Sequence, residues 1–232
     1  MRYAVLGTGV VGQVIAGKLA SLGHEVAVGT RDPEATLARS EPDGYGNPPF
    51  AHWKAAHEQV RLKTFADAAA WAESVVNATS GAGSLQALDA AGAANLAGKT
   101  LVDIANPLDF SQGMPPSLNP VNTDSLGEQI QRLFPQAKVV KTLNTMNCQV
   151  MVDPARVSGE HTVFVAGDDA DAKKAVSELL VSFGWPHGSI LDLGSIDAAR
   201  GTEMLLPIWL RLWGAVGHAD FNFHIQGGHT AA

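Results

Sequence analysis

The stretch that decides the fold is Tyr3-Ala4-Val5-Leu6-Gly7-Thr8-Gly9-Val10-Val11-Gly12, and a helical run follows it as far as Leu22. Short apolar residues lead directly into Gly-x-Gly-x-x-Gly. In a dinucleotide site, Gly7 would permit the tight turn, Gly9 would let the backbone approach a pyrophosphate, and Gly12 would let the helix pack closely on the strand. The N–H groups at the start of that helix would face the phosphates. The predicted pyrophosphate-binding residues are therefore Gly7, Thr8, Gly9, Val10, Val11 and Gly12.

Predicted strands and helices alternate along most of the chain. The strands are expected at 2–6, 25–29, 60–64, 74–78, 100–104, 139–143, 162–166 and 189–193. The helices are expected at 10–22, 66–72, 84–91, 125–134, 170–183 and 196–216, with shorter ones after 32 and at 52–59. This order predicts an α/β fold, a doubly wound parallel Rossmann sheet with a small, mostly helical C-terminal domain. The expected domains are residues 1–155, which bind NADP, and residues 156–232.

Composition narrows the class of protein. A formal net charge of −7 over 232 residues offers no basic surface to nucleic acid or to an anionic membrane. The single cysteine, Cys148, excludes an internal disulfide framework and favours a cytoplasmic setting. The most apolar late segment, 204–216, is too short to span a bilayer and contains Pro207 and Arg211. The eight histidines lack metal-ligand spacing, so we expect no metal site.

The end of the second strand indicates which dinucleotide binds. An NAD site usually has Asp or Glu there, which accepts hydrogen bonds from the ribose 2′-hydroxyl. This chain has Thr30 and Arg31, and a hydroxyl beside a guanidinium suits a 2′-phosphate. Asp32 could in principle contact the ribose, but its place before Pro33 is typical of a helix N-cap. We therefore predict NADPH as the cofactor.

Polar residues also follow the strands that would face the nicotinamide. They are Ala78-Thr79, Asn106-Pro107 and Asn144-Thr145, together with Thr8. Such residues are common in turns, but the carboxyl ends of parallel strands also form the ligand site. Nothing in this set titrates, and neither tyrosine is followed four residues later by the Lys of short-chain dehydrogenases. The pattern predicts a hydride acceptor that needs no protein acid, such as a flavin-like ring, and it identifies no catalytic residue.

Several other polar and aromatic residues have a structural interpretation. Asp168-Asp169 lies at a strand end before a helix and favours N-capping over a metal. Arg200 and Glu203 are three apart, as in an ion pair on one helix. Trp209 and Trp213 form an aromatic stripe, which predicts a core or dimer contact.

Six segments in the same order resemble one family. They are residues 7–12, 28–32, 102–108, 139–145, 166–169 and 193–200. Together they are similar to the NADP oxidoreductases typified by the coenzyme F(420)-dependent NADP reductases, a family that includes the reductase domains of STEAP ferric reductases. The resemblance implies a Rossmann domain with a small C-terminal domain, NADPH held by the glycine loop and Thr30-Arg31, and a flavin or deazaflavin in the cleft. It also implies a homodimer.

Two other functions remain open at this point. Pyrroline-carboxylate reductases share this type of cofactor domain, so the chain could reduce an imine or a small carbonyl. The Rossmann fold is a poor guide to chemistry, so an NADPH-binding sensor without catalysis is a third possibility.

Overall fold

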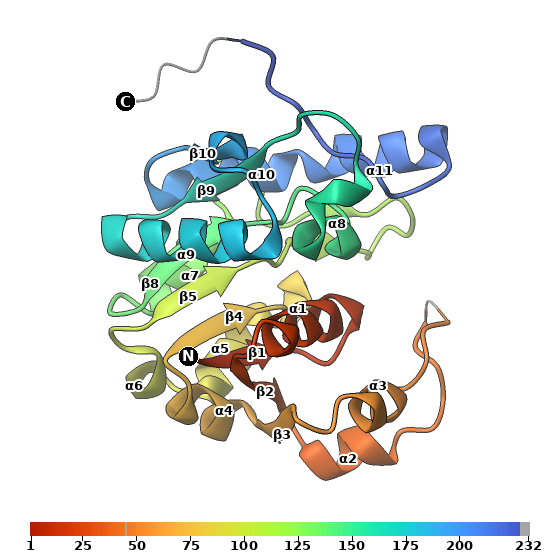
Figure 1. Ribbon diagram of the computed structural model, residues 1–232, viewed down its shortest axis with the longest axis vertical. Helices are drawn as coiled ribbons and strands as arrows, with labels where there is room; N and C mark the ends of the chain where they lie inside the picture. The colour runs from red at the N-terminus through yellow and green to blue at the C-terminus, as the bar shows by residue number, and fades with distance from the viewer. Residues whose placement is uncertain (45, 228–232) are drawn as a thin grey trace.

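One eight-stranded sheet organises the computed structural model, which describes residues 1–44 and 46–227. The strand order is β10-β9-β8-β5-β4-β1-β2-β3 (Figure 1). The strands are β1 (Arg2–Leu6), β2 (Glu25–Thr30), β3 (Arg61–Thr64), β4 (Ser74–Asn77), β5 (Thr100–Asp103), β8 (Lys138–Thr142), β9 (Val163–Ala166) and β10 (Ile190–Asp192). A separate short hairpin pairs β6 (Leu108–Asp109) with β7 (Ser117–Leu118).

Six of these strands, β3-β2-β1-β4-β5-β8, are parallel and have the Rossmann order. The crossover lies between β1 and β4, where a ligand crevice is expected. Beyond β8, strand β9 pairs antiparallel and β10 runs parallel to β9. The segment after residue 155 therefore contributes two strands to the same sheet as well as its helices. The domain boundary at 155/156 stays a prediction.

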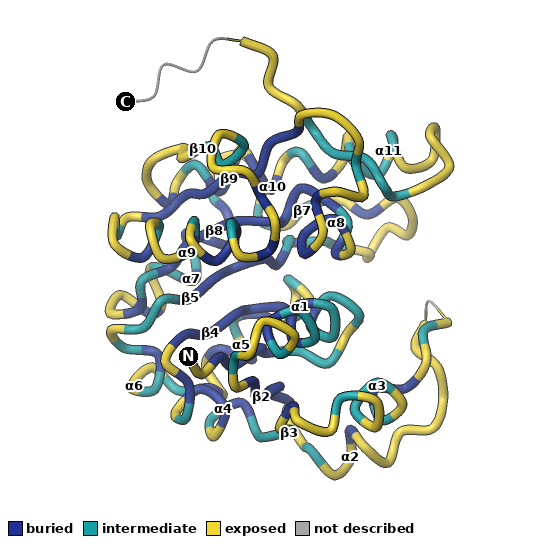
Figure 2. Tube along the Cα trace, viewed as in Figure 1, coloured by how far each residue is buried: buried dark blue, intermediate teal, exposed yellow. Residues whose placement is uncertain are grey.

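Helices cover both faces of the sheet (Figures 1 and 2). They are α1 (Val10–Ser21), α2 (Pro33–Ala38), α3 (Phe50–Ala56), α4 (Phe65–Trp71), α5 (Gly81–Ala91), α6 (Ala93–Leu96), α7 (Leu126–Leu133), α8 (Cys148–Val152), α9 (Ala170–Phe183), α10 (Ala199–Met204) and α11 (Leu206–Val216). Short 3-10 turns are η1 (Pro154–Arg156), η2 (His187–Ser189) and η3 (Ile196–Ala198). One core lies under α1, α8 and α9, and the other under α4 to α7.

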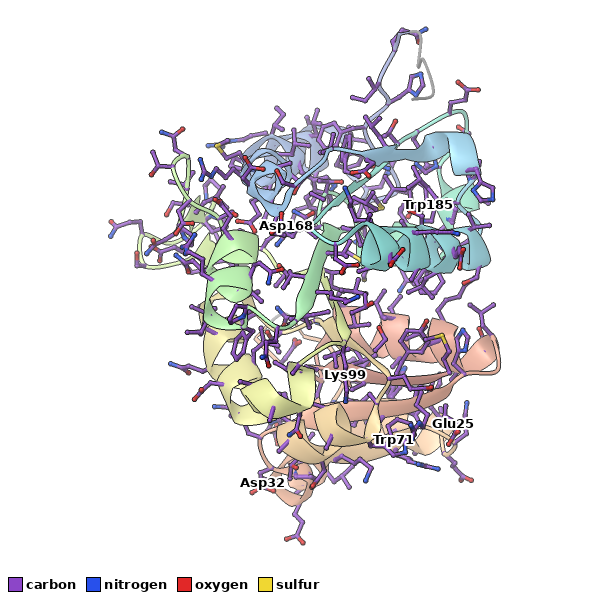
Figure 3. All side chains as sticks on the ribbon, turned by 90° about the vertical axis from the view of Figure 1, so that its left-hand side faces the viewer. Glu25, Asp32, Trp71, Lys99, Asp168 and Trp185 are labelled. Carbon is purple, nitrogen blue, oxygen red and sulfur yellow. The ribbon has the colours of Figure 1, made fainter. Side chains whose placement is uncertain are left out.

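Alternation along the central strand divides its side chains between these two cores. Tyr3 and Val5 point to the α1 face, whereas Ala4 and Leu6 point to the α4 face. Both faces are apolar, as a parallel sheet with helices on each side requires. Trp185, after α9, is 1% exposed in the first core and donates from Nε1 to the Met151 carbonyl at 3.0 Å (Figure 3).

Polar side chains cap the starts of three predicted helices, and the caps predicted at Asp32 and Asp169 are confirmed. Asp32 accepts from the Ala35 N–H at 3.0 Å, and Asp169 accepts from the Ala172 N–H at 2.8 Å. Ser125 accepts from the Glu128 N–H at 3.1 Å. These bonds satisfy N–H groups that have no partner inside their helices.

The C-terminal helical segment differs from the prediction in two ways. The expected helix at 196–216 is divided into η3, α10 and α11, and the break between α10 and α11 falls where Pro207 has no N–H to continue the ladder. The expected pair between Arg200 and Glu203 is wrong. Arg200 instead donates two hydrogen bonds to Glu128 of α7, and Glu203 contacts Lys141 of β8 at 2.8 Å.

Candidate functional site

A hollow of about 540 Å³ opens at the carboxyl ends of β1, β2 and β4. Its walls come from the glycine-rich turn, the β2–α2 connection, and the start of α5. The lining residues are Gly7, Thr8, Gly29, Thr30, Arg31, Asp32, Ala35, Thr36, Arg39, Phe65, Thr79, Ser80, Gly83, Gln86, Ala87 and Ala90. This is the edge at which open parallel sheets bind ligands.

The glycine-rich turn has the geometry that a pyrophosphate requires. Gly7 has φ +118°, and a Cβ there would meet the Ala78 carbonyl oxygen at 2.6 Å. A Cβ on Gly12 would meet the Gly7 carbonyl oxygen at 2.2 Å, which explains why α1 can pack so close to the turn. A Cβ on Gly9, by contrast, would meet nothing within 4 Å. The space beside Gly9, at the N-terminus of α1, therefore fits an incoming phosphate.

Arg31 and Arg39 line the same wall of the hollow. Most other arginines form ion pairs, for example Arg61 with Glu25 and Arg156 with Asp220. Within 1–44 and 46–227, neither Arg31 nor Arg39 makes an ion pair. Two guanidinium groups without carboxylate partners facing one hollow suit a doubly charged phosphate.

The neighbouring polar side chains are already engaged with α2. Asp32 caps the helix, as described above, and lies at its start (Figure 3). The Thr36 hydroxyl donates to the Asp32 carbonyl at 2.7 Å, so the Thr30 hydroxyl, 2.8 Å from it, is the donor of that pair. Thr30 is buried and orders the β2–α2 turn from inside. On this wall of the hollow, the side-chain donors that these bonds leave free for a phosphate are therefore the two guanidinium groups.

A second group of predicted residues lies at the ends of β5 and β8. Asn106 donates from Nδ2 to the Asn144 carbonyl at 2.7 Å, and Asn144 donates from Nδ2 to the Asn106 Oδ1 at 3.0 Å. Thr145 is buried beside them. Leu143, just before Asn144, has φ +61°, a strained conformation for a residue with a branched side chain. Strain of this kind marks a turn whose shape is held by its surroundings.

The structure thus divides the predicted site residues into two sets. Gly7, Thr8, Thr30, Arg31 and Thr79 line the hollow. Gly9, Val10, Val11, Gly12 and Ala78 adjoin this first set at the start of α1 and beside Gly7, but they are not among the lining residues. Asn106, Pro107, Asn144 and Thr145 form the second set, at the ends of β5 and β8, and do not line the hollow either. The two sets are joined where Gly81 of α5 packs on Asn106, since a Cβ on Gly81 would be 2.0 Å from the Asn106 carbonyl oxygen.

Sequence reasoning missed Arg39, Thr36 and the start of α5 as parts of this hollow. Arg39 lies just past α2 and lacked a motif, because only the fold of the β2–α2 connection brings it back to Arg31. The start of α5 had a signal in Thr79-Ser80-Gly81, a capping sequence directly after a strand.

The fold and its glycine-rich turn define a Rossmann-type dinucleotide-binding protein. A family model described as NADP oxidoreductase, coenzyme F(420)-dependent, matches residues 2–107. A crystal structure from Arthrobacter sp. FB24, described provisionally as an F(420)-dependent NADP-reductase, is 66% identical over 97% of this chain and 99% of that one, with a TM-score of 0.92. The chain belongs to this family of NADP oxidoreductases.

Two more distant similarities were also found. The metalloreductase STEAP3 of Rattus norvegicus is 29% identical over 90% of this chain, which spans only 38% of the length of that protein. A reductive aminase from Aspergillus terreus, in complex with NADPH and ethyl levulinate, shares the fold at 16% identity and a TM-score of 0.61, covering 93% of this chain and 62% of that one. In the part of the chain that the structure describes, no helix is both long and apolar enough to cross a bilayer.

Proposed function

We propose that this chain transfers hydride between NADP(H) and a flavin or deazaflavin acceptor of the coenzyme F(420) type. The adenosine half would occupy the hollow, with its 2′-phosphate on Arg31 and Arg39 and its pyrophosphate on residues 7–12 at the start of α1. The nicotinamide would then extend past Thr79 toward Asn106, Asn144 and Thr145, on the β4–β5–β8 side of the crossover.

The choice of a flavin-type acceptor is based on the side chains on the nicotinamide side of the site. The side chains on the nicotinamide side offer amides and hydroxyls, and the two asparagines are hydrogen-bonded to each other. A ketone would need a donor for its developing alkoxide. A flavin or deazaflavin accepts the hydride on its own ring and takes the accompanying proton from water, so the protein has mainly to align two rings.

The experiment is rapid mixing of the protein with NADPH and, separately, coenzyme F(420), FMN, FAD and a cyclic imine. We expect NADPH absorbance to fall as the flavin-type acceptor is reduced, one hydride for each acceptor. Deuterium at one face of the nicotinamide C4 should transfer to the acceptor ring. Turnover with the imine alone, or NADPH binding without any turnover, would refute this proposal in favour of the imine reductase or the sensor.

We propose in addition that α11 joins two copies of the chain. Ile208, Trp213 and Val216 are each 46–47% exposed on this short helix. The rings of Trp209 and Trp213 stack at 6.1 Å, and Trp209 also stacks on Phe221 at 5.2 Å. An exposed aromatic and aliphatic face of this kind is typical of a self-complementary interface.

We also propose a cytoplasmic location, since one buried cysteine suits a reducing compartment.

A further inference from the structure

A row of buried polar side chains crosses three neighbouring strands just below the nicotinamide side of the site. Asn77 of β4 is in register with Asp103 of β5, and Asp103 is in register with Lys141 of β8. All three are 0% exposed. The alternation of each strand directs them to the same face, toward α5, α7 and α10. Glu203 of α10, 2% exposed, completes the set, which we call the polar row.

Each member of the polar row is bonded to the next. Lys141 Nζ lies 2.9 Å from Asp103 Oδ2 and 2.8 Å from Glu203 Oε1. Asn77 Nδ2 donates to Asp103 Oδ1 at 2.9 Å. Burial by itself lowers the pKa of Lys141, but the two carboxylates outweigh it and the pKa is raised, so the lysine stays charged. Buried charges in such a network are costly unless every partner is present.

The site-facing end of the row reaches both strand-end loops. Asn77 Oδ1 accepts from the Thr79 hydroxyl at 2.7 Å and from the Thr79 N–H at 3.3 Å. Asp103 Oδ1 accepts from the Ala105 N–H at 3.2 Å, and Lys141 Nζ donates to the Ala105 carbonyl at 2.5 Å. The residue just before Asn106 is thus held on both sides. One carboxylate fixes the loops that carry two of the predicted nicotinamide contacts.

The far end of the polar row, at Glu203, bonds to α7 and not to the loops of the site. Glu203 accepts from the backbone N–H of Leu126 at 2.9 Å and of Gly127 at 3.1 Å, at the start of α7. These bonds attach α10 to α7 and have no contact with the site. Asp103 and Glu203 therefore form a matched pair, because each accepts from Lys141 and from two further N–H donors.

From this arrangement we infer that Asp103, acting through Asn77 and through the Ala105 backbone, is the positioning residue for the nicotinamide half of the cofactor, whereas Glu203 has only a structural role. The inference rests on the proposed function, since it requires that NADP(H) binds here. It adds residues that make no contact with the ligand themselves.

The test compares Asp103→Asn with Glu203→Gln. Every partner of either carboxylate is a donor, so each amide places one NH₂ against a donor and the two variants are chemically matched. Two ligands are titrated with each protein, NADPH and adenosine 2′,5′-bisphosphate, which lacks the nicotinamide. We expect Asp103→Asn to raise the Kd of NADPH by about tenfold or more and to raise the Kd of the bisphosphate far less, since among the residues that Asp103 positions only Thr79 lines the hollow. Glu203→Gln should lower Tm yet change neither Kd.

Each possible outcome decides for or against the role of Asp103. Equal changes in NADPH affinity for the two variants, or equal changes for the two ligands in Asp103→Asn, would overturn the inference. Wild-type protein that binds neither ligand would overturn the proposed function instead. If Asp103→Asn does not fold, Asn77→Ser is tested instead. This change removes the hydrogen bonds from Thr79 to Asn77 and leaves both lysine–carboxylate contacts in place. Unaltered NADPH binding by folded Asn77→Ser would equally overturn the inference.

Discussion

Arg31 and Arg39 show how two residues eight positions apart become one binding wall. The turn between them is held by the Asp32 cap and by the buried pair of hydroxyls from Thr30 and Thr36. Because the polar atoms of the turn are satisfied locally, the two guanidinium groups carry the positive charge of the hollow. Selectivity between the two nicotinamide coenzymes should therefore depend on these arginines.

We predict that Arg31→Ala and Arg39→Ala each raise the Michaelis constant for NADPH by about tenfold or more. Loss of one charge-assisted phosphate contact costs about 1.5–3 kcal/mol. Neither change should affect NADH, which has no 2′-phosphate. Arg156→Ala, in η1, removes the same charge outside the hollow and serves as the control. Equal effects on both coenzymes would show that the 2′-phosphate binds elsewhere.

At the scale of elements, the start of α7 is held by several charged contacts. Asp124, just before the helix, receives two hydrogen bonds from Arg132, at 3.0 Å from Nη1 and at 2.8 Å from Nη2. Gln129 adds a third at 3.0 Å. The Arg132 guanidinium lowers the pKa of Asp124 to about 2. The folded carboxyl therefore stays ionised where an unfolded one is protonated.

This pKa shift predicts a pH-dependent contribution to stability. A lowered folded pKa stabilises the protein above the unfolded value, about 3.9, and the contribution disappears as pH falls through about 2. Arg132→Gln should therefore lower Tm near neutral pH, and the difference from wild type should shrink below about pH 4. An NMR titration should find the midpoint of Asp124 at about 2 in the wild type and higher in the variant.

Arg156→Gln breaks the equivalent bidentate pair with Asp220, far from α7 in sequence, and should leave the Asp124 midpoint unchanged. A wild-type midpoint near 3.9 would show that the Arg132 contact does not persist in solution.

The sequence predicted the elements that local patterns define better than the contacts between segments that are distant in the chain. β1 and α9 were predicted residue for residue, and β2, β5 and β9 to within one residue, since apolar runs and local caps define them. The polar row was missed, although Asp103 and Lys141 each interrupt an apolar strand and thereby gave a signal. Their register across β5 and β8 depends on pairing between strands that the sequence does not specify locally. The partners of Arg200 and Glu203 were wrong for the same reason.

For the candidate site, the sequence predicted the glycine turn and the strand ends, because each is a local pattern. It did not show that Arg39 faces the same hollow as Arg31, or that the asparagines at the ends of β5 and β8 bond to each other. These are contacts between segments whose approach depends on the assembled sheet. The residue-level contacts to NADP(H) stay predictions.

For the whole molecule, we predict that the chain dimerises through α11. Trp213→Glu should weaken the dimer by about tenfold or more, because large aromatic residues dominate such interfaces and a buried carboxylate would lack a partner. Sedimentation velocity over a range of concentrations measures the effect. Leu133→Glu, at a 54% exposed leucine on α7, is the control and should leave the dimer intact. Wild-type protein that stays monomeric throughout would contradict the prediction.

The antiparallel direction of β9 determines on which side of the sheet helices α10 and α11 lie. Because β9 runs against β8, it returns the polypeptide to the amino edge of the parallel strands, where Asp169 pairs with Lys138 at 3.0 Å. After α9, strand β10 runs parallel to β9 and ends at the same edge, so α10 runs back and its Glu203 reaches Lys141 near the carboxyl end of β8. Helix α11 therefore starts on the same rim as the cofactor crevice. A second copy bound through α11 would lie next to the opening of this crevice. Dimerisation would then affect how an acceptor reaches the nicotinamide.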